Sequence, residues 1–220
     1  MKNYILFLNG KYNTKDINFY KHLCDQKITV AVDGGFSFFK KARMIPDILI
    51  GDMDSVKGKP YITNPEIKLI LFPPKKNETD SQLAVEYCIK NNAQSIDIIM
   101  PSVGEWDHCL GNLMLLTNEK ILKATQQSKK IKIINKNLEL FYLKDNQLIF
   151  SNYKNNIISV IPFSKSIILN SYGMEYHAEN LKIKRGHSHS LRNRIKTKRA
   201  KIIVQGEAFV IHEFSEEKFS

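Results

Sequence analysis

Short apolar runs separated by helical patterns are the feature of the first 135 residues that most restricts the fold. Six candidate strands lie at 4–8, 28–32, 47–50, 67–72, 96–100 and 131–134. Several are continuous runs of Ile, Val and Leu, which is typical of a parallel sheet covered on both faces. Between them, segments such as 81–90 and 108–117 carry apolar residues three and four positions apart. The pattern predicts an α/β domain in which helices connect parallel strands.

From about residue 138 the helical periodicity disappears. Short strand-like segments follow at 138–143, 147–150, 157–161, 167–169, 181–184 and 200–204, with Gly, Asn, Ser and Pro between them. This spacing predicts a small antiparallel sandwich or barrel. We therefore expect two domains, 1–136 and 137–220.

The charge balance favours a polyanionic partner. The chain of 220 residues has a formal net charge of +11, which suits nucleic acid, a membrane surface or a nucleotide. No zinc-finger spacing or aromatic RNA-binding string accompanies the basic residues, so nucleic acid is not the favoured partner. No apolar run approaches the roughly 18–20 residues of a membrane span. Three widely spaced cysteines and no signal-peptide core lead us to expect a cytoplasmic protein.

Acidic residues directly follow two of the predicted strands. The 28–32 strand leads into Asp33, Gly34 and Gly35, and the 47–50 strand is followed by Asp52 and Asp54. In open α/β sheets, ligands bind just beyond the carboxyl ends of the strands. Glycine at such a position lets the backbone approach a ligand closely. The pattern predicts a ligand site at this edge of the sheet.

Two further motifs begin predicted helices, and each has a purely structural interpretation. Thr79 and Gln82 have the spacing of a capping box, and Asp107 precedes a helical pattern as an N-cap does. On this interpretation Thr79 and Asp107 only cap helices, and His108 is a structural histidine. Taken one at a time, these residues favour that interpretation.

As a set, the carboxylates point to a cation. Asp33, Asp52, Asp54 and Asp80 are expected at one edge of the sheet, where crowded carboxylates repel each other unless a cation neutralises them. Mg²⁺ takes oxygen ligands, usually includes only one or two carboxylates, and shares its shell with water and phosphate. Neither a GxxxxGK[ST] loop nor a GxGxxG fingerprint is present. The sequence therefore predicts a site for a magnesium-bound polyphosphate that is not a P-loop.

These motifs occur in the order and spacing of the thiamin pyrophosphokinase family, which the chain resembles over most of its length. The motifs are Asp33-Gly34-Gly35, Ile50-Gly51-Asp52-Met53-Asp54-Ser55, Thr79-Asp80, Asp107-His108-x-x-Gly111-Asn112, Gly173-Met174-Glu175-Tyr176 and the stretch from Gly186 to Asn193. The resemblance implies a Rossmann-like α/β domain with a mostly parallel sheet that binds ATP, followed by a C-terminal antiparallel β-sandwich that binds thiamin and dimerises. It also implies a homodimer with its active sites at the subunit interface. The implied reaction transfers the pyrophosphoryl group of Mg-ATP to the hydroxyl of thiamin, giving thiamin diphosphate and AMP.

The resemblance also implies roles for individual residues. Asp52, Asp54 and Asp80 would bind Mg²⁺, and Asp54 and Asp80 are the candidate catalytic carboxylates. Nucleotide and phosphate contacts are implied for Asp33, Gly34, Gly35, Thr79, Asp107, His108 and Asn112. Thiamin contacts are implied for Ser190 and Asn193.

The chain departs from the family pattern at positions that bear on phosphate binding. Glu105 stands where the family usually has Arg, and Arg192 stands where Ser is usual. The family's acidic loop before Thr79 is replaced by Lys75-Lys76-Asn77-Glu78. Our hypothesis is that basic residues near the site meet the phosphate charge instead: Lys75, Lys76, Arg192 or Arg194.

Two alternative functions stay open at this point. A related pyrophosphokinase acting on another alcohol, such as a hydroxymethyl pterin, would use the same metal chemistry. A basic nucleic-acid-binding protein would instead bind in a steeply salt-dependent way and tolerate loss of the aspartates. The likeness in the second half favours thiamin.

Overall fold

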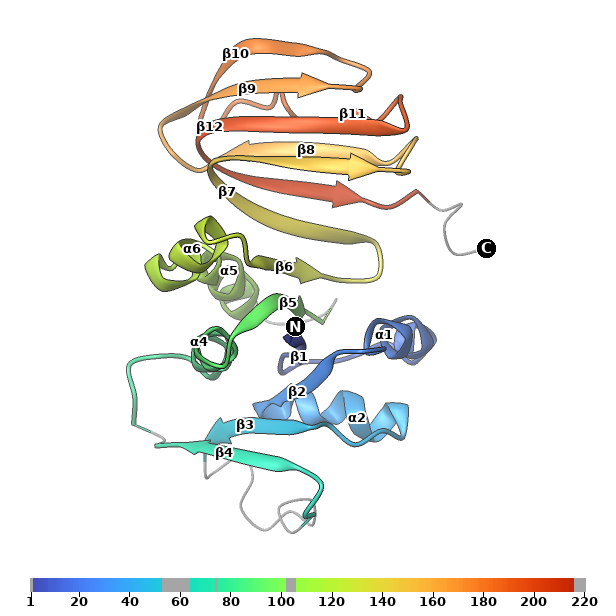
Figure 1. Ribbon diagram of the computed structural model, residues 1–220, viewed down its shortest axis with the longest axis vertical. Coiled ribbons are helices and arrows are strands. Elements are labelled where there is room, and N and C mark those ends of the chain that lie inside the picture. The colour runs from blue at the N-terminus through green and yellow to red at the C-terminus, as the bar shows by residue number, and fades with distance from the viewer. Residues whose placement is uncertain (1, 53–63, 74, 102–105, 216–220) are drawn as a thin grey trace. The chain divides into compact units, whose positions relative to one another are not determined.

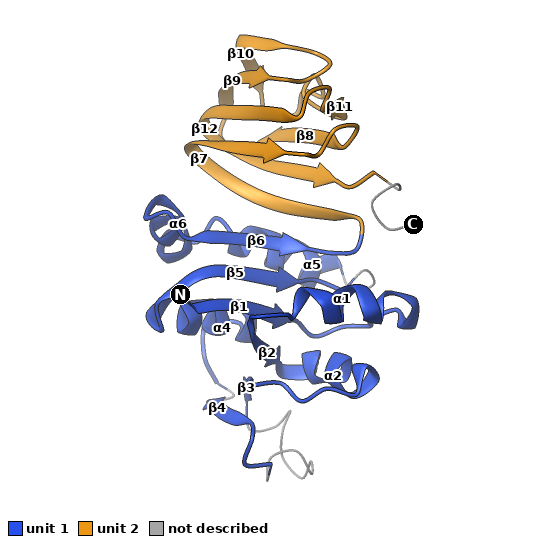
Figure 2. Ribbon diagram, turned by 45° about the vertical axis from the view of Figure 1, so that its right-hand side comes forward, with its two compact units in different colours: residues 1–136 blue, residues 137–220 orange. Residues whose placement is uncertain are grey.

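The computed structural model describes residues 2–52, 64–73, 75–101 and 106–215. It divides into two compact units, Met1–Lys136 and Asn137–Ser220, which Figure 2 shows in different colours. This division lies where the sequence changes from an α/β to an all-β pattern. We call them the first and second units and describe each by itself.

The first unit contains a parallel sheet (Figure 1). Its strands are β1 (Lys2–Phe7), β2 (Ile28–Val32), β3 (Ile48–Asp52), β4 (Lys68–Phe72), β5 (Ala93–Ile99) and β6 (Lys130–Ile134). They lie in the order β6-β5-β1-β2-β3-β4, and each neighbouring pair is parallel. The six predicted strands are thus confirmed. Since the chain runs outward from β1 to β4 and then returns to β5, the strand order reverses between β1 and β5, where such sheets bind ligands.

Helices connect these strands. They are α1 (Ile17–Leu23), α2 (Phe36–Ala42), α4 (Asp80–Lys90), α5 (Trp106–Leu115) and α6 (Glu119–Gln126), with short 3-10 turns at Thr14–Asp16 and Asp33–Gly35. The structure confirms the helical patterns at 81–90 and 108–117 to within two residues. Within the described ranges, no helix is long and apolar enough to cross a membrane.

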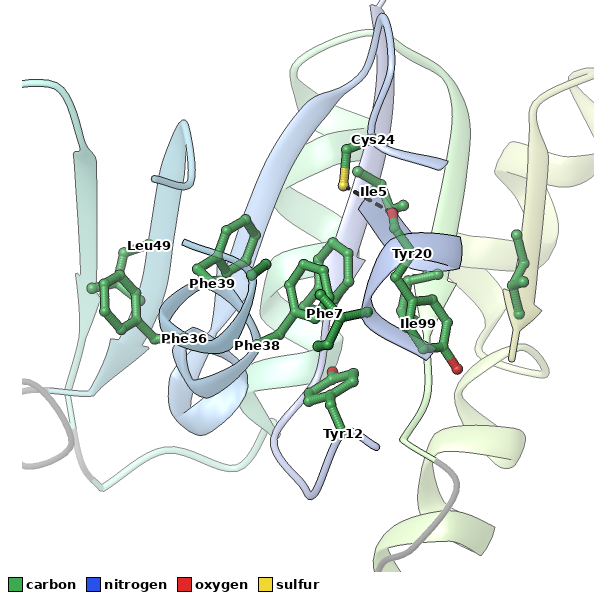
Figure 3. Close-up of a cluster of buried hydrophobic side chains, with 14 of the residues drawn as sticks. Ile5, Phe7, Tyr12, Tyr20, Cys24, Phe36, Phe38, Phe39, Leu49 and Ile99 are labelled. Atoms are coloured by element: carbon green, nitrogen blue, oxygen red, sulfur yellow. Dashed lines mark hydrogen bonds between the residues drawn. The ribbon is translucent and has the colours of Figure 1, made fainter. Parts of the chain in front are cut away.

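An aromatic core fixes the carboxyl end of β1 (Figure 3). The rings of Phe7 and Phe38 stack with centroids 3.9 Å apart and an interplanar angle of 9°. Phe39 and Tyr20 meet Phe7 edge-on, with centroids 5.1 and 6.4 Å from it. Rings of this size contribute much of the burial energy of a domain. The packing holds α1 and α2 against β1, and with them the loop in which β1 ends.

The second unit is antiparallel throughout. Its strands are β7 (Leu138–Ser151), β8 (Ile157–Pro162), β9 (Ser166–Tyr172), β10 (Ala178–Lys184), β11 (Asn193–Arg194) and β12 (Arg199–Glu213). Strand β12 pairs with β7 along most of its length, with β9 through its first half and with β8 through its second half. The mixed α/β fold of the chain is therefore confirmed. The arrangement of the second-unit strands as a sandwich stays a prediction.

Two predicted boundaries in this unit are wrong. The strands predicted at 138–143 and 147–150 form one strand, and the strand predicted at 200–204 continues to Glu213. The polar residues that suggested a break belong to an irregularity in the pairing of β7 with β12. Asp145, with φ +46°, accepts a hydrogen bond from the N–H of Gly206, with φ +97°, at 2.7 Å. A bulge of this kind bends a strand pair without ending it.

A buried polar network lies in the core of the second unit. His212 is fully buried, and its ring nitrogens contact Asn156 Nδ2 at 2.8 Å and Glu139 Oε1 at 2.9 Å. The Asn156 side-chain oxygen accepts from the Ser215 N–H at 3.0 Å, which orients the amide. Asn156 therefore donates to His212 Nε2, and the proton on Nδ1 is donated to Glu139. The network ties the end of β12 to β7.

Candidate active site

A cleft of about 690 Å³ lies where the first turn of α4 faces α5. Five residues predicted to contact nucleotide or metal line it: Thr79, Asp80, Asp107, His108 and Asn112. The structure thus brings together residues that are up to 33 positions apart in the sequence, at the carboxyl side of the parallel sheet. Its volume falls in the range of about 300–1,000 Å³ typical of small-molecule sites.

Thr79 forms only half of the expected capping box. It is the N-cap of α4, and its Oγ1 accepts from the Gln82 N–H at 3.2 Å. The described residues show no reciprocal bond from the Thr79 N–H to the Gln82 side chain, whose Nε2 instead donates to Glu86 at 3.0 Å. The other N–H groups of the first turn of α4 lie beside the cleft, as in helix termini that bind anions.

Asp80, the first residue of α4, is already paired with a cation. Lys76 Nζ lies 2.8 Å from Asp80 Oδ1, and both side chains are largely buried, with exposed fractions of 12% and 23%. The same ammonium lies 6.0 Å from the centroid of the Phe72 ring. In this structure Lys76 and Asp80 therefore form an ion pair at the start of α4. That it also meets phosphate charge stays a hypothesis.

The cleft wall formed by α5 leaves room for a ligand. Helix α5 begins at Trp106, so Asp107 is its second residue and not its N-cap; Asp107 Oδ1 accepts from the adjacent His108 N–H at 2.7 Å. The side chains of Asp107 and His108 are exposed. At Gly111 an added Cβ would meet no atom within 4 Å. The exposed Asp107 and His108 side chains and the open space at Gly111 leave this face of α5 accessible to a ligand.

The motif that follows β2 is close-packed and does not line the cleft. Asp33 has φ +49°, an uncommon conformation for a residue other than glycine. A Cβ at Gly35 would overlap the carbonyl oxygen of Phe7, and one at Gly34 would overlap the side chain of Asn9. These glycines thus allow the β2 turn to pack against the end of β1. Asn9, which lies beside this turn at the reversal point of the sheet, was missed by the sequence analysis, although an Asn-Gly pair after the first buried strand could have signalled it.

The predicted metal ligands are described only in part. Asp52 ends β3, is half-buried and lies opposite Phe72 of β4. Helix α4, which carries Asp80, packs on β2 and β3. Asp54 lies outside the described residues, as does Glu105. Among the residues that are described, no group of three or more His, Cys, Asp or Glu side chains is arranged to hold a metal ion.

The two residues predicted to contact thiamin lie in the second unit, and their polar groups bond to the backbone. Ser190 Oγ donates to the Val160 carbonyl at 2.6 Å. Asn193 accepts from the Tyr176 N–H at 3.0 Å and donates to the Tyr176 carbonyl at 2.7 Å. The cavity that both residues line measures about 50 Å³, which is too small for an organic substrate. Contact with thiamin stays a prediction for both.

The arginines that flank Asn193 are paired with carboxylates. Arg192 Nη1 lies 3.1 and 3.0 Å from the two carboxylate oxygens of Glu213. Arg194 Nε lies 3.7 Å from Glu175, and its Nη1 donates to the Asn155 carbonyl. These side chains are largely exposed, so each ion pair contributes at most about 1 kcal/mol to stability. Each arginine can therefore exchange its carboxylate partner for another anion.

Comparison with known proteins identifies the family. The sequence model of the thiamin pyrophosphokinase catalytic domain matches residues 19–133, which is just over half of the chain. A thiamine pyrophosphokinase of Bacillus subtilis is 27% identical over 175 residues, covering 78% of this chain and 79% of that protein. A crystal structure of the enzyme from this species matches 97% of this chain and all of its own, with a TM-score of 0.77 and 23% identity. The yeast thiamin pyrophosphokinase structure gives a TM-score of 0.78 at 14% identity, covering 99% of this chain and 88% of its own. The chain belongs to the thiamin pyrophosphokinase family.

Proposed function

We propose that this protein is a thiamin pyrophosphokinase that converts thiamin and Mg-ATP to thiamin diphosphate and AMP. One observation carries the proposal: the family match covers the unit in which Thr79, Asp80, Asp107, His108 and Asn112 line one cleft. Family membership favours thiamin over a pterin, and it favours an enzyme over a nucleic-acid-binding protein.

In the proposed reaction, the hydroxyl oxygen of thiamin forms a bond to the β-phosphorus of ATP. The bond between that phosphorus and the oxygen bridging to the α-phosphate breaks, and AMP leaves with the electron pair. The hydroxyl proton passes to a carboxylate, for which we propose Asp80 or Asp54. The first turn of α4 would bind phosphate oxygens through its N–H groups, while residues of α5 would orient the nucleotide.

The donor set suits Mg²⁺. Asp52 and Asp80 are carboxylates from a strand end and a helix start that pack together, and one or two carboxylates are what a magnesium–nucleotide site usually takes from a protein. We propose these two, with Asp54, as its ligands. The bound ion would neutralise charge on the phosphate oxygens during transfer.

The direct test is to incubate the purified protein with ATP, MgCl₂ and thiamin and to quantify nucleotides and thiamin esters by chromatography. We expect AMP and thiamin diphosphate in equal amounts, and no ADP. Formation of ADP, or turnover with a hydroxymethyl pterin but not with thiamin, would overturn the assignment.

Single substitutions test the residue roles. Asp80→Asn and Asp52→Asn should each lower kcat at least about a hundredfold, because each removes a charge that acts on the reacting phosphates. Asp25→Asn, an exposed residue beyond α1, makes the same chemical change outside the cleft and should leave kcat unchanged. Activity that survives in Asp80→Asn would remove Asp80 from the proposed mechanism.

We also propose that the protein is a cytoplasmic homodimer with its active sites at the subunit interface. Helix α5 supports this, because Trp106, Leu110 and Met114 form an apolar stripe four residues apart, with exposed fractions of 83%, 53% and 41%. Exposed apolar side chains on one helix face indicate a protein interface. Light scattering of the purified protein should give twice the chain mass, and Trp106→Ser with Leu110→Ser should shift it towards the monomer. A monomeric parent protein would refute the dimer.

A further inference from the structure

A second concave site in the first unit is lined by residues of strand β4 and of helices α4 and α6. This groove has a volume of about 600 Å³ and shares no lining residue with the cleft. Its floor is apolar, formed by Ile70 and Phe72 of β4, Leu83 and Tyr87 of α4, and Ala124 of α6. Leu83 and Tyr87 are one helical turn apart and so present one continuous face. An apolar floor of this size is typical of a site for a small organic molecule.

The edge of the groove carries a surplus of positive charge. Among the described lining residues, Lys90, Lys120 and Lys123 are basic and Glu86 is acidic. Lys120 is paired with Glu86 at 2.6 Å. For Lys90 and Lys123, the described part of the chain offers no carboxylate partner. The ammonium groups of Lys90 and Lys123 therefore lie beside the apolar floor without a carboxylate partner among the described residues.

The Glu86 carboxyl is held in its ionised form by its hydrogen-bond partners. Burial pushes the pKa of its carboxyl upward, but hydrogen bonds from Gln82 and Lys120, together with the Lys120 charge, outweigh burial and lower it. The hydrogen bond that Lys120 donates to Glu86 also raises the pKa of Lys120. This pair therefore stays ionised at neutral pH, and Glu86 is not available to neutralise the other two lysines.

We propose that the groove binds an amphipathic carboxylic acid of the medium-chain fatty acid class. The alkyl chain would cover the floor between Phe72 and Tyr87, and the carboxylate would bind Lys90 or Lys123. A protein partner fits less well, because a standard interface buries about 800 Å² on each side, whereas all five floor residues are themselves half-buried or buried. An unsubstituted phosphate would leave the apolar floor exposed.

Binding is tested by titrating octanoate, decanoate and dodecanoate, below their micelle concentrations, into the full-length ¹⁵N-labelled protein. We expect amide shifts concentrated in α4 and α6, and an affinity that rises about two- to fourfold with each added CH₂, the increment for a partly to fully buried methylene. Decanol has the same chain without the charge and should bind at least about fivefold more weakly. Equal binding of decanol, or shifts centred elsewhere, would overturn the proposal.

Charge-reversal variants provide the matched control. Lys123→Glu and Lys90→Glu should each weaken decanoate binding about five- to tenfold, while Lys154→Glu, an exposed lysine of the second unit, makes the same change in net charge and should have no effect. Thermal melts verify that each variant is folded. Equal weakening by Lys154→Glu would show that net charge attracts the probe. Binding to phosphatidylglycerol vesicles without binding to free decanoate would show a membrane-surface site instead.

Discussion

Replacing His212 by leucine is expected to destabilise the second unit by about 3–5 kcal/mol. The ring is fully buried and forms hydrogen bonds with Asn156 and Glu139. Leucine cannot form either bond, so both residues would lose their partner at once. The Asn156 amide would lose its acceptor, at a cost of about 1–3 kcal/mol, and Glu139 would lose a hydrogen bond to a charged group, worth about 1.5–3 kcal/mol. Leucine can replace much of the packing against Phe150 and Tyr153, so the loss is mainly polar.

Urea unfolding followed by circular dichroism measures the change, and hydrogen exchange with mass spectrometry locates it. Protection should fall in β7 and β12, because Glu139 and His212 of the network lie on these strands, and should change least in the first unit. Glu139→Gln keeps an oxygen that accepts from His212 and should cost only about 1 kcal/mol. His22→Leu, at an exposed histidine, is the control. A loss below about 1 kcal/mol for His212→Leu would refute the idea that this network stabilises the unit.

Three other predictions concern the first unit. Gly35→Ala should cost about 1–3 kcal/mol or more, measured by thermal melts, because the new methyl would overlap the Phe7 carbonyl. Gly111→Ala should stabilise α5 by about 0.5–1 kcal/mol, because the exposed site has space for a methyl. The same methyl narrows the cleft, so the KM for ATP should rise; a lower melting temperature or an unchanged KM would contradict this account. Burial raises the pKa of the Cys24 thiol to about 12, so this thiol stays protonated at about pH 8.5. Maleimide should therefore modify the half-buried Cys109 first. Early modification of Cys24 would contradict the packing around it.

The sequence predicted the fold best where local pattern and tertiary environment agree. The run that became β2 is mostly apolar and buried because both faces of the sheet are covered, so its composition identified it. Strand β7 was divided wrongly because Asp145 is polar and bulged, whereas the pairing of β7 with β12 on both sides of Asp145 shows that the strand continues. Neither helix α1 nor helix α6 was predicted. A single sequence does not record such pairings between distant segments.

For the candidate site, the ordered motifs predicted which residues belong to it better than they predicted how those residues are arranged. They selected residues such as Thr79 and Asn112, which the fold brings into one cleft. They did not separate these from Gly35, which serves the packing of the β2 turn, or reveal that Lys76 pairs with Asp80. These distinctions depend on contacts between segments, and a motif carries no information about its neighbours in space.

Strand β12 also determines when each unit can form during synthesis. All strands of the first unit lie within the first 134 residues, so this unit can fold while the rest of the chain is still being made. The second unit cannot, because β7, β8 and β9 all pair with β12, which begins only at Arg199. Until then β7, already synthesised, lacks the partner that covers its edge. A nascent chain stalled before this point would expose unpaired strands to neighbouring ribosomes and chaperones, although its first unit is complete.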